Sequence, residues 1–241
     1  MKTYFSKNYP AWLFCLYLIV FAFASYKPNY ISDYILESSL SVAFLLFLFF
    51  TRNKLRLSNI SYTLIFVFLV LHTIGAHYTY SEVPYNSFFE KILGFNINEF
   101  FGFERNHYDR LVHFCFGLFL AYPIRELFMR VANARGFWGY YLPFDVTASF
   151  SAIYELIEWM ASVVFGGELG IAYLGAQGDI WDAQKDMALA IGGAIIAMLI
   201  TFFVNLKYKK DFSKDFTDSF KIKRKAPLGE VEIAKMIKKS S

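Results

Sequence analysis

Ionisable side chains inside apolar segments are the feature that most constrains how this chain can fold. Eight of them fall in three consecutive segments that are otherwise apolar enough to cross a membrane. In lipid hydrocarbon a charged group is costly unless it pairs with another group, binds an ion or faces a wet cavity. We therefore expect one shared polar site, formed by Asp109, His113, Glu155, Glu158, Asp179, Asp182, Lys185 and Asp186.

The composition of the whole chain predicts a membrane protein. Of the 241 residues, 56% are hydrophobic and only 18% are charged, whereas about 25% are charged in soluble domains. Six apolar segments approach the ~20 residues that a helix needs to span a bilayer. The predicted fold class is all-α, a polytopic integral membrane bundle whose six transmembrane helices cover residues 11–26, 34–50, 60–78, 107–127, 143–165 and 179–206.

The distribution of Lys and Arg predicts the orientation of the bundle. Of the 24 such residues, 19 lie on one side of the predicted membrane and 3 lie on the other. Positively charged connections stay in the cytoplasm, so we expect both termini there. Residues 1–206 then form one transmembrane domain, and residues 207–241 form a basic cytoplasmic tail that faces anionic lipid. Nucleic acid is not an expected partner, because no base-stacking or groove-reading motif accompanies this charge.

The first apolar segment has two interpretations. Lys2 and Lys7 precede it, and Ala22-Phe23-Ala24 resembles a small-x-small cleavage site, so residues 1–24 could be a cleaved signal peptide. A retained helix is favoured, because further apolar segments follow it. The orientation of the other five segments is the same in both interpretations.

The long connection over residues 79–106 lies on the outer side. Phe88, Phe89, Ile92 and Leu93 recur in it at helical spacing, which predicts a short helix at the membrane interface. An anchor in the lipid headgroups is favoured over a lid above the polar site.

A shared depth gathers polar residues from four of the predicted helices. At 1.5 Å per residue, His72, His113, Glu158 and Asp186 each lie about 9–10 Å below the outer end of their helix. They therefore occupy one level in the outer half of the membrane. The small pair Gly193 and Ala197 would let neighbouring helices approach closely.

Spacing within each segment places further polar residues beside these four. Asp109 is four residues from His113, so both lie on one face of a helix. Tyr154 and Glu155 form a similar stripe with Glu158. In the last segment Asp179, Asp182 and Asp186 share an arc with Lys185 at its edge, and His77, Arg110 and Gln177 complete the candidate site.

Carboxylates and imidazoles that converge from several helices suit two kinds of chemistry. They can hold a divalent metal ion, for which the candidate ligands are His113, Glu158, Asp182 and Asp186. They can also transfer protons. The candidate catalytic residues are Asp109, His113, Glu155, Glu158, Asp182, Lys185 and Asp186.

Each of these residues also has a purely structural interpretation. Asp109 and Asp179 open helices, where an acid favours the helix dipole. Lys185 is expected to pair with one of the acids. His72 and His77 could simply bond to neighbouring helices. The buried depth of Glu158 and Asp186 favours a functional site over a set of separate contacts.

Four blocks of sequence carry a resemblance to a known family. They are HTIGAHYTY (72–80), RNHYDRLVHFCFGLFLAYPIREL (105–127), YELIEW (154–159) and LGAQGDIWDAQKDMALAIGGA (174–194). Together they resemble the YjdF-type bacterial inner-membrane proteins. The resemblance implies a multi-pass protein of the bacterial inner (plasma) membrane, and it implies no particular reaction.

A more distant similarity is to VanZ-like membrane proteins, which show an acidic-basic pair followed by His, then a helix with Glu and a helix with Asp. Asp109-Arg110 with His113 fills the first of these places. Glu158 and Asp186 stand where that pattern has amide side chains. The more acidic set here argues against a shared activity.

Three functions fit the predicted site. The first is an enzyme that acts on a lipid, a lipid-linked sugar or a cell-envelope fragment at the outer leaflet. The second is a proton- or cation-coupled carrier that uses Glu155, Glu158 and Asp186. The third is a non-catalytic structural or partner protein. Membrane lipids are expected partners in every case, and six spans are few for a carrier unless the protein forms a homo-oligomer.

Overall fold

The fold is described by a computed structural model that covers residues 5–167, 177–208, 212–222 and 227–240. Regular structure in these residues is entirely helical, as the sequence predicts. The helices are α1 (Phe5–Ala24), α2 (Ile31–Thr51), α3 (Asn59–His77), α4 (Tyr85–Leu93), α5 (Ile97–Phe101), α6 (Tyr108–Val131), α7 (Trp138–Phe165), α9 (Asp182–Tyr208), α10 (Phe212–Asp218) and α11 (Leu228–Ser240).

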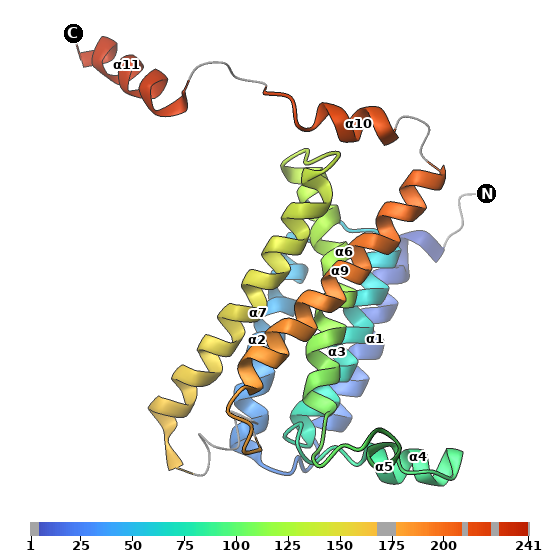
Figure 1. Cartoon of the computed structure of the whole chain (residues 1–241). Helices are drawn as coiled ribbons and strands as arrows, with labels where there is room; N and C mark the ends of the chain where they lie inside the picture. Colours follow the sequence, from blue (N-terminus) through green and yellow to red (C-terminus); the bar gives the residue numbers. More distant parts are fainter. Residues whose placement is uncertain (1–4, 168–176, 209–211, 223–226, 241) are drawn as a thin grey trace.

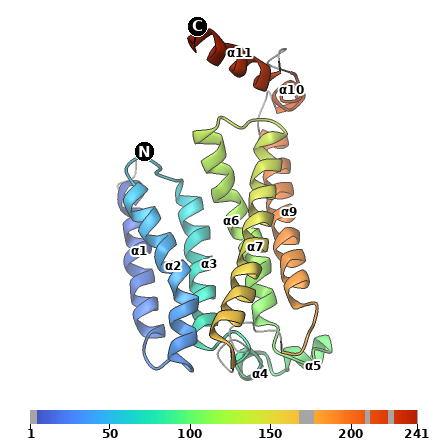
Figure 2. The same ribbon diagram turned by 90° about the vertical axis from the view of Figure 1, so that its left-hand side faces the viewer.

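Six long helices form an antiparallel bundle (Figure 1). Five of them, α2, α3, α6, α7 and α9, are long and apolar enough to cross a membrane, and α1 adds a shorter apolar stretch over Asn8–Ala24. The start of α1 and the end of α9 lie at the same end of the bundle, while α4 and α5 lie at the opposite end (Figures 1 and 2). The predicted polytopic helical membrane fold is confirmed, and six crossings fit it.

Helix α7 begins at Trp138 rather than at the predicted residue 143. Its first turns carry Tyr and Trp, which favour the membrane interface over the hydrocarbon. A prediction from apolar residues alone therefore gave a helix that begins too late. The indole Nε1 of Trp138 donates a hydrogen bond to the backbone oxygen of Ser219. The first turn of α7 is thus held by the segment that follows α10.

Part of the predicted tail packs on the bundle. Phe212 on α10 is buried, and its ring lies 5.0 Å from that of Phe202 on α9 and 5.9 Å from that of Phe216. Helix α11 stands apart from the bundle in both views (Figures 1 and 2). Helix α10, in the predicted tail, thus contacts the end of α9, and the predicted boundary at residue 207 stays a prediction.

Helix α6 is the centre of the bundle, since it packs on α3, α7 and, most extensively, α9. The α6–α9 contact is a contact between backbones. A Cβ added to Gly117 on α6 would collide with the backbone oxygen of Ala190 on α9, and a Cβ added to Gly193 would collide with the backbone of Phe114 and Leu118. Small residues are what permit this approach.

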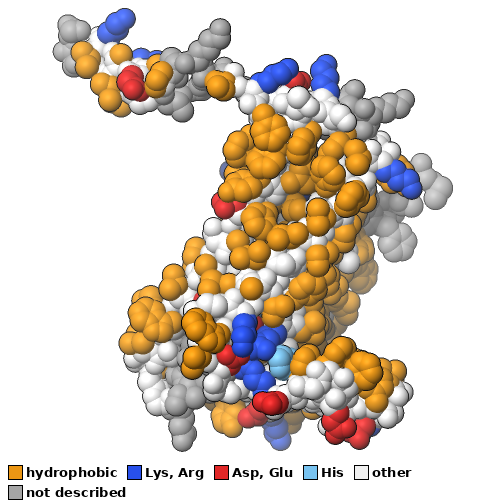
Figure 3. Space-filling view, viewed as in Figure 1, with side chains coloured by type: hydrophobic (Ala, Val, Ile, Leu, Met, Phe, Trp, Pro, Cys, Tyr) orange, Lys and Arg blue, Asp and Glu red, His pale blue; other side chains and the backbone are white. Residues whose placement is uncertain are grey.

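The other half of the bundle is built on α3. The hydroxyl of Tyr17 on α1 lies 2.9 Å from that of Thr73 on α3, within a core of Tyr17, Ile65, Leu69 and Leu120. Helix α2 packs against α3 as well. The space-filling view shows hydrophobic side chains along the length of the helices, with charged groups near both ends (Figure 3).

The close approach of α6 and α9 predicts the effect of two neighbouring substitutions. Gly193→Ala should lower the free energy of unfolding by about 1–3 kcal/mol, because its new methyl group overpacks the interface. Gly192→Ala is the matched control, since a Cβ there meets open space, and it should be neutral or stabilising by up to about 1 kcal/mol. Unfolding of both variants in one detergent provides the measurement. Equal stability of the two variants would contradict the α6–α9 packing.

Candidate functional site

Three metal-ligand side chains meet between α6 and α9. One donor atom from each of Asp109, His113 and Asp186 lies within 4.8 Å of the others. Asp109 and His113 are one turn apart on α6, and the glycine-mediated approach of α9 brings Asp186 to them. His113 and Asp186 are buried, at 7% and 2% exposure.

Glu155 on α7 completes what we call the inner cluster, namely Asp109, His113, Glu155 and Asp186. The imidazole of His113 stands between two carboxylates. Its Nε2 is 3.5 Å from Oδ1 of Asp109, and its Nδ1 is 3.6 Å from Oε1 of Glu155. These are ion-pair distances and are too long for good hydrogen bonds.

Several buried polar atoms at the inner cluster have no hydrogen-bond partner among the described residues. They are Oε1 of Glu155, Oδ1 of Asp186 and Oγ of the nearby Ser151. Each such atom costs about 1–3 kcal/mol when it stays unsatisfied. Together they make the inner cluster a group of buried polar side chains that is only partly satisfied by hydrogen bonds among the described residues.

Glu158 lies next to the inner cluster. It is buried one turn beyond Glu155 on α7 and interacts electrostatically with Asp109, Glu155, Glu37 and Asp186. Glu158 is not among the three side chains whose donor atoms lie within 4.8 Å of one another. Of the four predicted metal ligands His113, Glu158, Asp182 and Asp186, the structure brings His113 and Asp186 together, and Asp109 is the third group beside them.

Asp182 and Lys185 belong to a second group of charges, which we call the outer network. Nη2 of Arg110 lies 2.5 Å from Oδ2 of Asp179, and Nζ of Lys185 lies 2.6 Å from the same oxygen. Arg105 pairs with Asp182 and approaches Asp179 to 3.7 Å. The expected pairing of Lys185 with an acid is thus present, and Asp182 faces arginines instead of His113.

The outer network covers the end of the bundle from which α6 and α9 begin. Three cations here face two carboxylates. In Figure 3, Lys and Arg (blue) lie among acids (red) and a histidine (pale blue) at the end that carries α4 and α5. Predicted site residues therefore form two layers, a cationic outer layer and an acidic inner one.

Contacts in the outer network lower the pKa of two groups, Asp179 within it and His107 beside it. The hydrogen bond that Lys185 donates to Asp179 holds the pKa of this carboxyl well below its ordinary value. The hydrogen bond from the backbone N–H of Trp181 lowers the same pKa. His107 has a lowered pKa, because burial and then the charges of Arg110 and Arg105 disfavour its protonated form. A neutral His107 and an ionised Asp179 are therefore the states at neutral pH.

Two acids on α2 were missed by the sequence analysis. Asp33 and Glu37 are buried, at 1% and 4% exposure. Glu37 accepts a hydrogen bond of 2.9 Å from the hydroxyl of Tyr154, which lies one residue from Glu155. The signal was present, because Glu37 is an ionisable residue inside the predicted span 34–50.

His72, predicted at the same level as His113, lies beside Glu37. Its Nε2 is 3.2 Å from the backbone oxygen of Glu37, and its Nδ1 is bonded to the hydroxyl of Tyr80. His77 lies elsewhere, with Nδ1 2.7 Å from the backbone oxygen of Ala24 at the end of α1. His77 is therefore separate from the site.

Gln177 is exposed at the outer end of the bundle. Its Nε2 donates a hydrogen bond of 3.1 Å to the backbone oxygen of Asn106, just before α6. Gln177 thus links the segment before α9 to the start of α6 and takes a supporting position. The rest of the glycine-rich connection, residues 168–176, lies outside the described residues.

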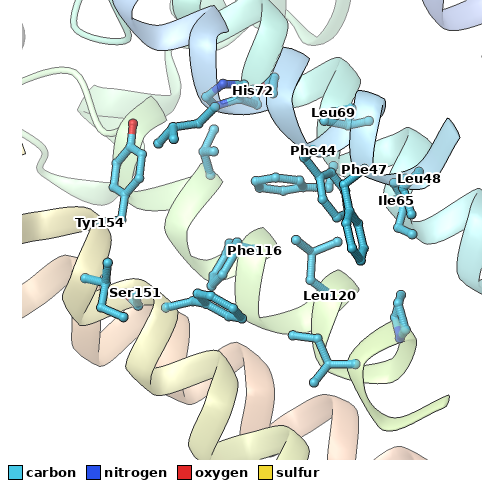
Figure 4. A pocket seen from close by; sticks show the side chains of 18 of the residues that line it. Phe44, Phe47, Leu48, Ile65, Leu69, His72, Phe116, Leu120, Ser151 and Tyr154 are labelled. Atoms are coloured by element: carbon cyan, nitrogen blue, oxygen red, sulfur yellow. The ribbon is translucent and has the colours of Figure 1, made fainter. Parts of the chain in front are cut away.

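A cavity of about 470 Å³ begins at the polar residues. Asp109, His113, His72 and Tyr154 line its one end, and apolar side chains of α2, α3, α6 and α7 line the remainder. Figure 4 shows His72, Tyr154 and Ser151 toward one side and the apolar side chains of Phe44, Phe47, Leu48 and Ile65 toward the other. Asp109 and His113 therefore belong both to the inner cluster and to the lining of this largely apolar cavity.

A helical multi-pass membrane protein with a buried acid–histidine site is what fold and geometry define. The sequence model of a family described as "Predicted membrane protein (DUF2238)" matches residues 9–207, so the chain belongs to this family. Over 150 aligned residues it is 38% identical to "Inner membrane protein YjdF" of Escherichia coli (strain K12). The aligned region covers 62% of this chain and 68% of that protein. No solved structure matches.

These comparisons confirm the resemblance to the YjdF-type proteins and a multi-pass location in the inner membrane. They do not show the similarity to VanZ-like proteins, which stays a prediction. The two findings establish the family and the location of the protein, and neither assigns a chemistry to the site.

The outer network predicts a pH-dependent contribution to stability. Asp179→Asn should destabilise the protein at neutral pH, because it removes the shared partner of Arg110 and Lys185. The pKa of Asp179 is lower in the folded protein than in the unfolded chain. The stability that its ion pairs contribute is therefore fully present above about pH 4 and is lost as the pH falls through the folded pKa. The difference in unfolding free energy between wild type and variant should therefore shrink only below about pH 4.

Glu104→Gln is the control for this experiment, since Glu104 is exposed near the start of α6. It should leave stability unchanged at neutral pH. A gap between wild type and Asp179→Asn that persists undiminished in strong acid would contradict the ionic role of Asp179.

Proposed function

We propose that this protein is a membrane-embedded, metal-dependent hydrolase that cleaves an ester or phosphoester bond of an envelope lipid in the outer half of the membrane. The observation that carries the proposal is the meeting of Asp109, His113 and Asp186 within 4.8 Å, where Asp109 and His113 also line the polar end of an apolar cavity. A bond placed there is surrounded by donor atoms on one side and by hydrocarbon on the other.

The donor set suits a divalent ion such as Zn²⁺ or Mn²⁺. Two carboxylates and one imidazole offer the oxygen and nitrogen ligands that these metals take, and three protein ligands leave positions for water and substrate. A bound cation would also offset the negative charge of the acids at Asp109, Glu155 and Asp186. Such an ion supplies a polarised substrate oxygen and a more acidic water.

Glu155 is placed to act as the base. Its Oε1 has no hydrogen-bond partner among the described residues and lies 3.6 Å from His113. In the proposed reaction one water adds its oxygen to the acyl carbon or the phosphorus, and Glu155 takes the water proton. The C–O or P–O bond to the alcohol then breaks, and the alcohol leaves with a proton returned by the inner cluster.

A proton- or cation-coupled carrier is the second candidate. The observation that favours it is the pair of buried acids on α2, Asp33 and Glu37, which the hydrolase does not use. With the inner cluster they place buried or half-buried carboxylates on four helices, α2, α6, α7 and α9. Ion or proton flux into vesicles that depends on Glu37 and Asp186 would support the carrier, and flux that ignores both would remove it.

The metal site predicts a specific loss of bound ion. Asp186→Asn or His113→Ala should weaken binding of Zn²⁺ or Mn²⁺ by more than the ~10–100-fold that loss of an outer hydrogen-bond partner causes. Elemental analysis and equilibrium dialysis of the purified protein provide the measurement. Asp145→Asn, an exposed acid on α7, should bind metal like the wild type. A wild-type protein that binds neither ion would overturn the metal-dependent proposal.

The assigned base predicts a variant that separates binding from catalysis. Glu155→Gln should keep the metal and lower the rate by about 100- to 10,000-fold, the usual contribution of a general base. The rate is that of product formation from a total envelope lipid extract in vesicles, followed by mass spectrometry. Asp145→Asn should keep full activity. If Glu155→Gln turns over at the wild-type rate, the assignment of Glu155 fails.

A further inference from the structure

We infer that the ligand of this site is a membrane lipid whose long apolar chain lies in the cavity between α2, α3, α6 and α7, with its polar group at Asp109 and His113, which line the polar end of that cavity. The inference rests on the proposed function for its polar end only. The position of the chain follows from the shape, the lining and the opening of the cavity.

The cavity is long enough for an extended chain. On α6 its lining runs from Asp109 to Leu127, and this stretch of helix is about 27 Å long at 1.5 Å per residue. The hydrocarbon core of a bilayer measures about 30 Å. A volume of about 470 Å³ lies in the ~300–1,000 Å³ range of ligand sites. A headgroup alone would leave most of this space unfilled.

Beyond its polar end the cavity is lined mainly by hydrocarbon side chains, with Ser41 and Thr51 as polar exceptions on α2. The hydrocarbon side chains include Phe44, Leu48, Ile65, Leu69, Phe116 and Leu120 (Figure 4). An apolar cavity of this kind offers water too few hydrogen-bond partners. A lipid chain makes the dispersion contacts that such a lining lacks when it is empty. Hydrocarbon is therefore the chemistry that matches this part of the cavity.

The cavity opens sideways toward the surroundings of the bundle. Leu40 and Phe47 on α2, and Phe150 and Ile153 on α7, line it and are also 41–53% exposed. They stand on the two edges of an opening between α2 and α7. In a membrane this opening faces the lipid chains, so a chain can enter without crossing water.

A hydrogen bond limits the opening at its outer end. Tyr154 on α7 donates to Glu37 on α2, which joins the two helices next to the inner cluster. On the membrane-core side of this bond, Leu40, Phe47, Phe150 and Ile153 leave the cavity open to a lipid chain. At the outer end the ligand meets acids and imidazole, which suits a phosphate or ester oxygen that shares a bound cation.

Photolabelling in a bilayer tests the position of the chain. The full-length protein is placed in vesicles of phosphatidylethanolamine and phosphatidylglycerol that contain a phosphatidylethanolamine with a diazirine on one acyl chain. After irradiation, mass spectrometry of peptides measures label at Phe116 and Leu120 in the cavity. Leu199 and Phe203, exposed on α9, report ordinary contact with bulk lipid.

The inference predicts two behaviours of the cavity label. Label at Phe116 and Leu120 should saturate as the fraction of probe rises, whereas label at Leu199 and Phe203 should rise in proportion to it. The double variant Leu40→Trp/Ile153→Trp should lower cavity label by roughly tenfold, because bulky rings fill the opening from both edges. Leu199→Trp is the matched control and should leave the label at Phe116, Leu120 and Phe203 unchanged.

The outcomes separate this inference from the proposed function. Cavity label that is absent, or that rises like label on α9 in the wild type, overturns the lipid-chain inference, and it does so even if the double variant fails to fold. Asp186→Asn should lose the metal and keep the cavity label. A wild type that takes up lipid but no metal would leave the chain site standing and remove the metal-dependent hydrolase.

Discussion

The contact between the backbones of α6 and α9 is the constraint on which the site depends. Gly117 and Gly193 leave no room for side chains between these helices. Only because the helices approach so closely can Asp186 on α9 reach Asp109 and His113, which lie one turn apart on α6. The packing that stabilises the bundle and the geometry of the donor atoms are therefore one feature.

The two layers of charge differ in how their acids are compensated. In the outer network, cations stand beside Asp179 and Asp182, so the acids are compensated by partners within the protein. In the inner cluster, His113 is the cationic candidate among several acids, and oxygens of Glu155 and Asp186 have no hydrogen-bond partner among the described residues. Buried groups without compensation are typical of functional sites.

The sequence predicted the helices and the level of the site better than it predicted the partners of each side chain. Apolar length and depth counting need only helix geometry, so they placed His113 and Asp186 together. Whether Asp182 faces His113 or Arg105 depends on the rotation of α9 and on a connection before α6, which no periodicity reports. Glu37 on α2 was within reach of the same criterion, since it too is an ionisable residue in an apolar span.

The opening between α2 and α7 has a practical consequence for anyone who isolates this protein. In a micelle the same gap faces surfactant tails, which resemble the proposed occupant and outnumber it greatly. Solubilisation would then exchange a native guest for a synthetic one before any assay begins. Lipid nanodiscs or native polymer extraction keep the original guest in place, and the choice of surfactant becomes an experimental variable in its own right.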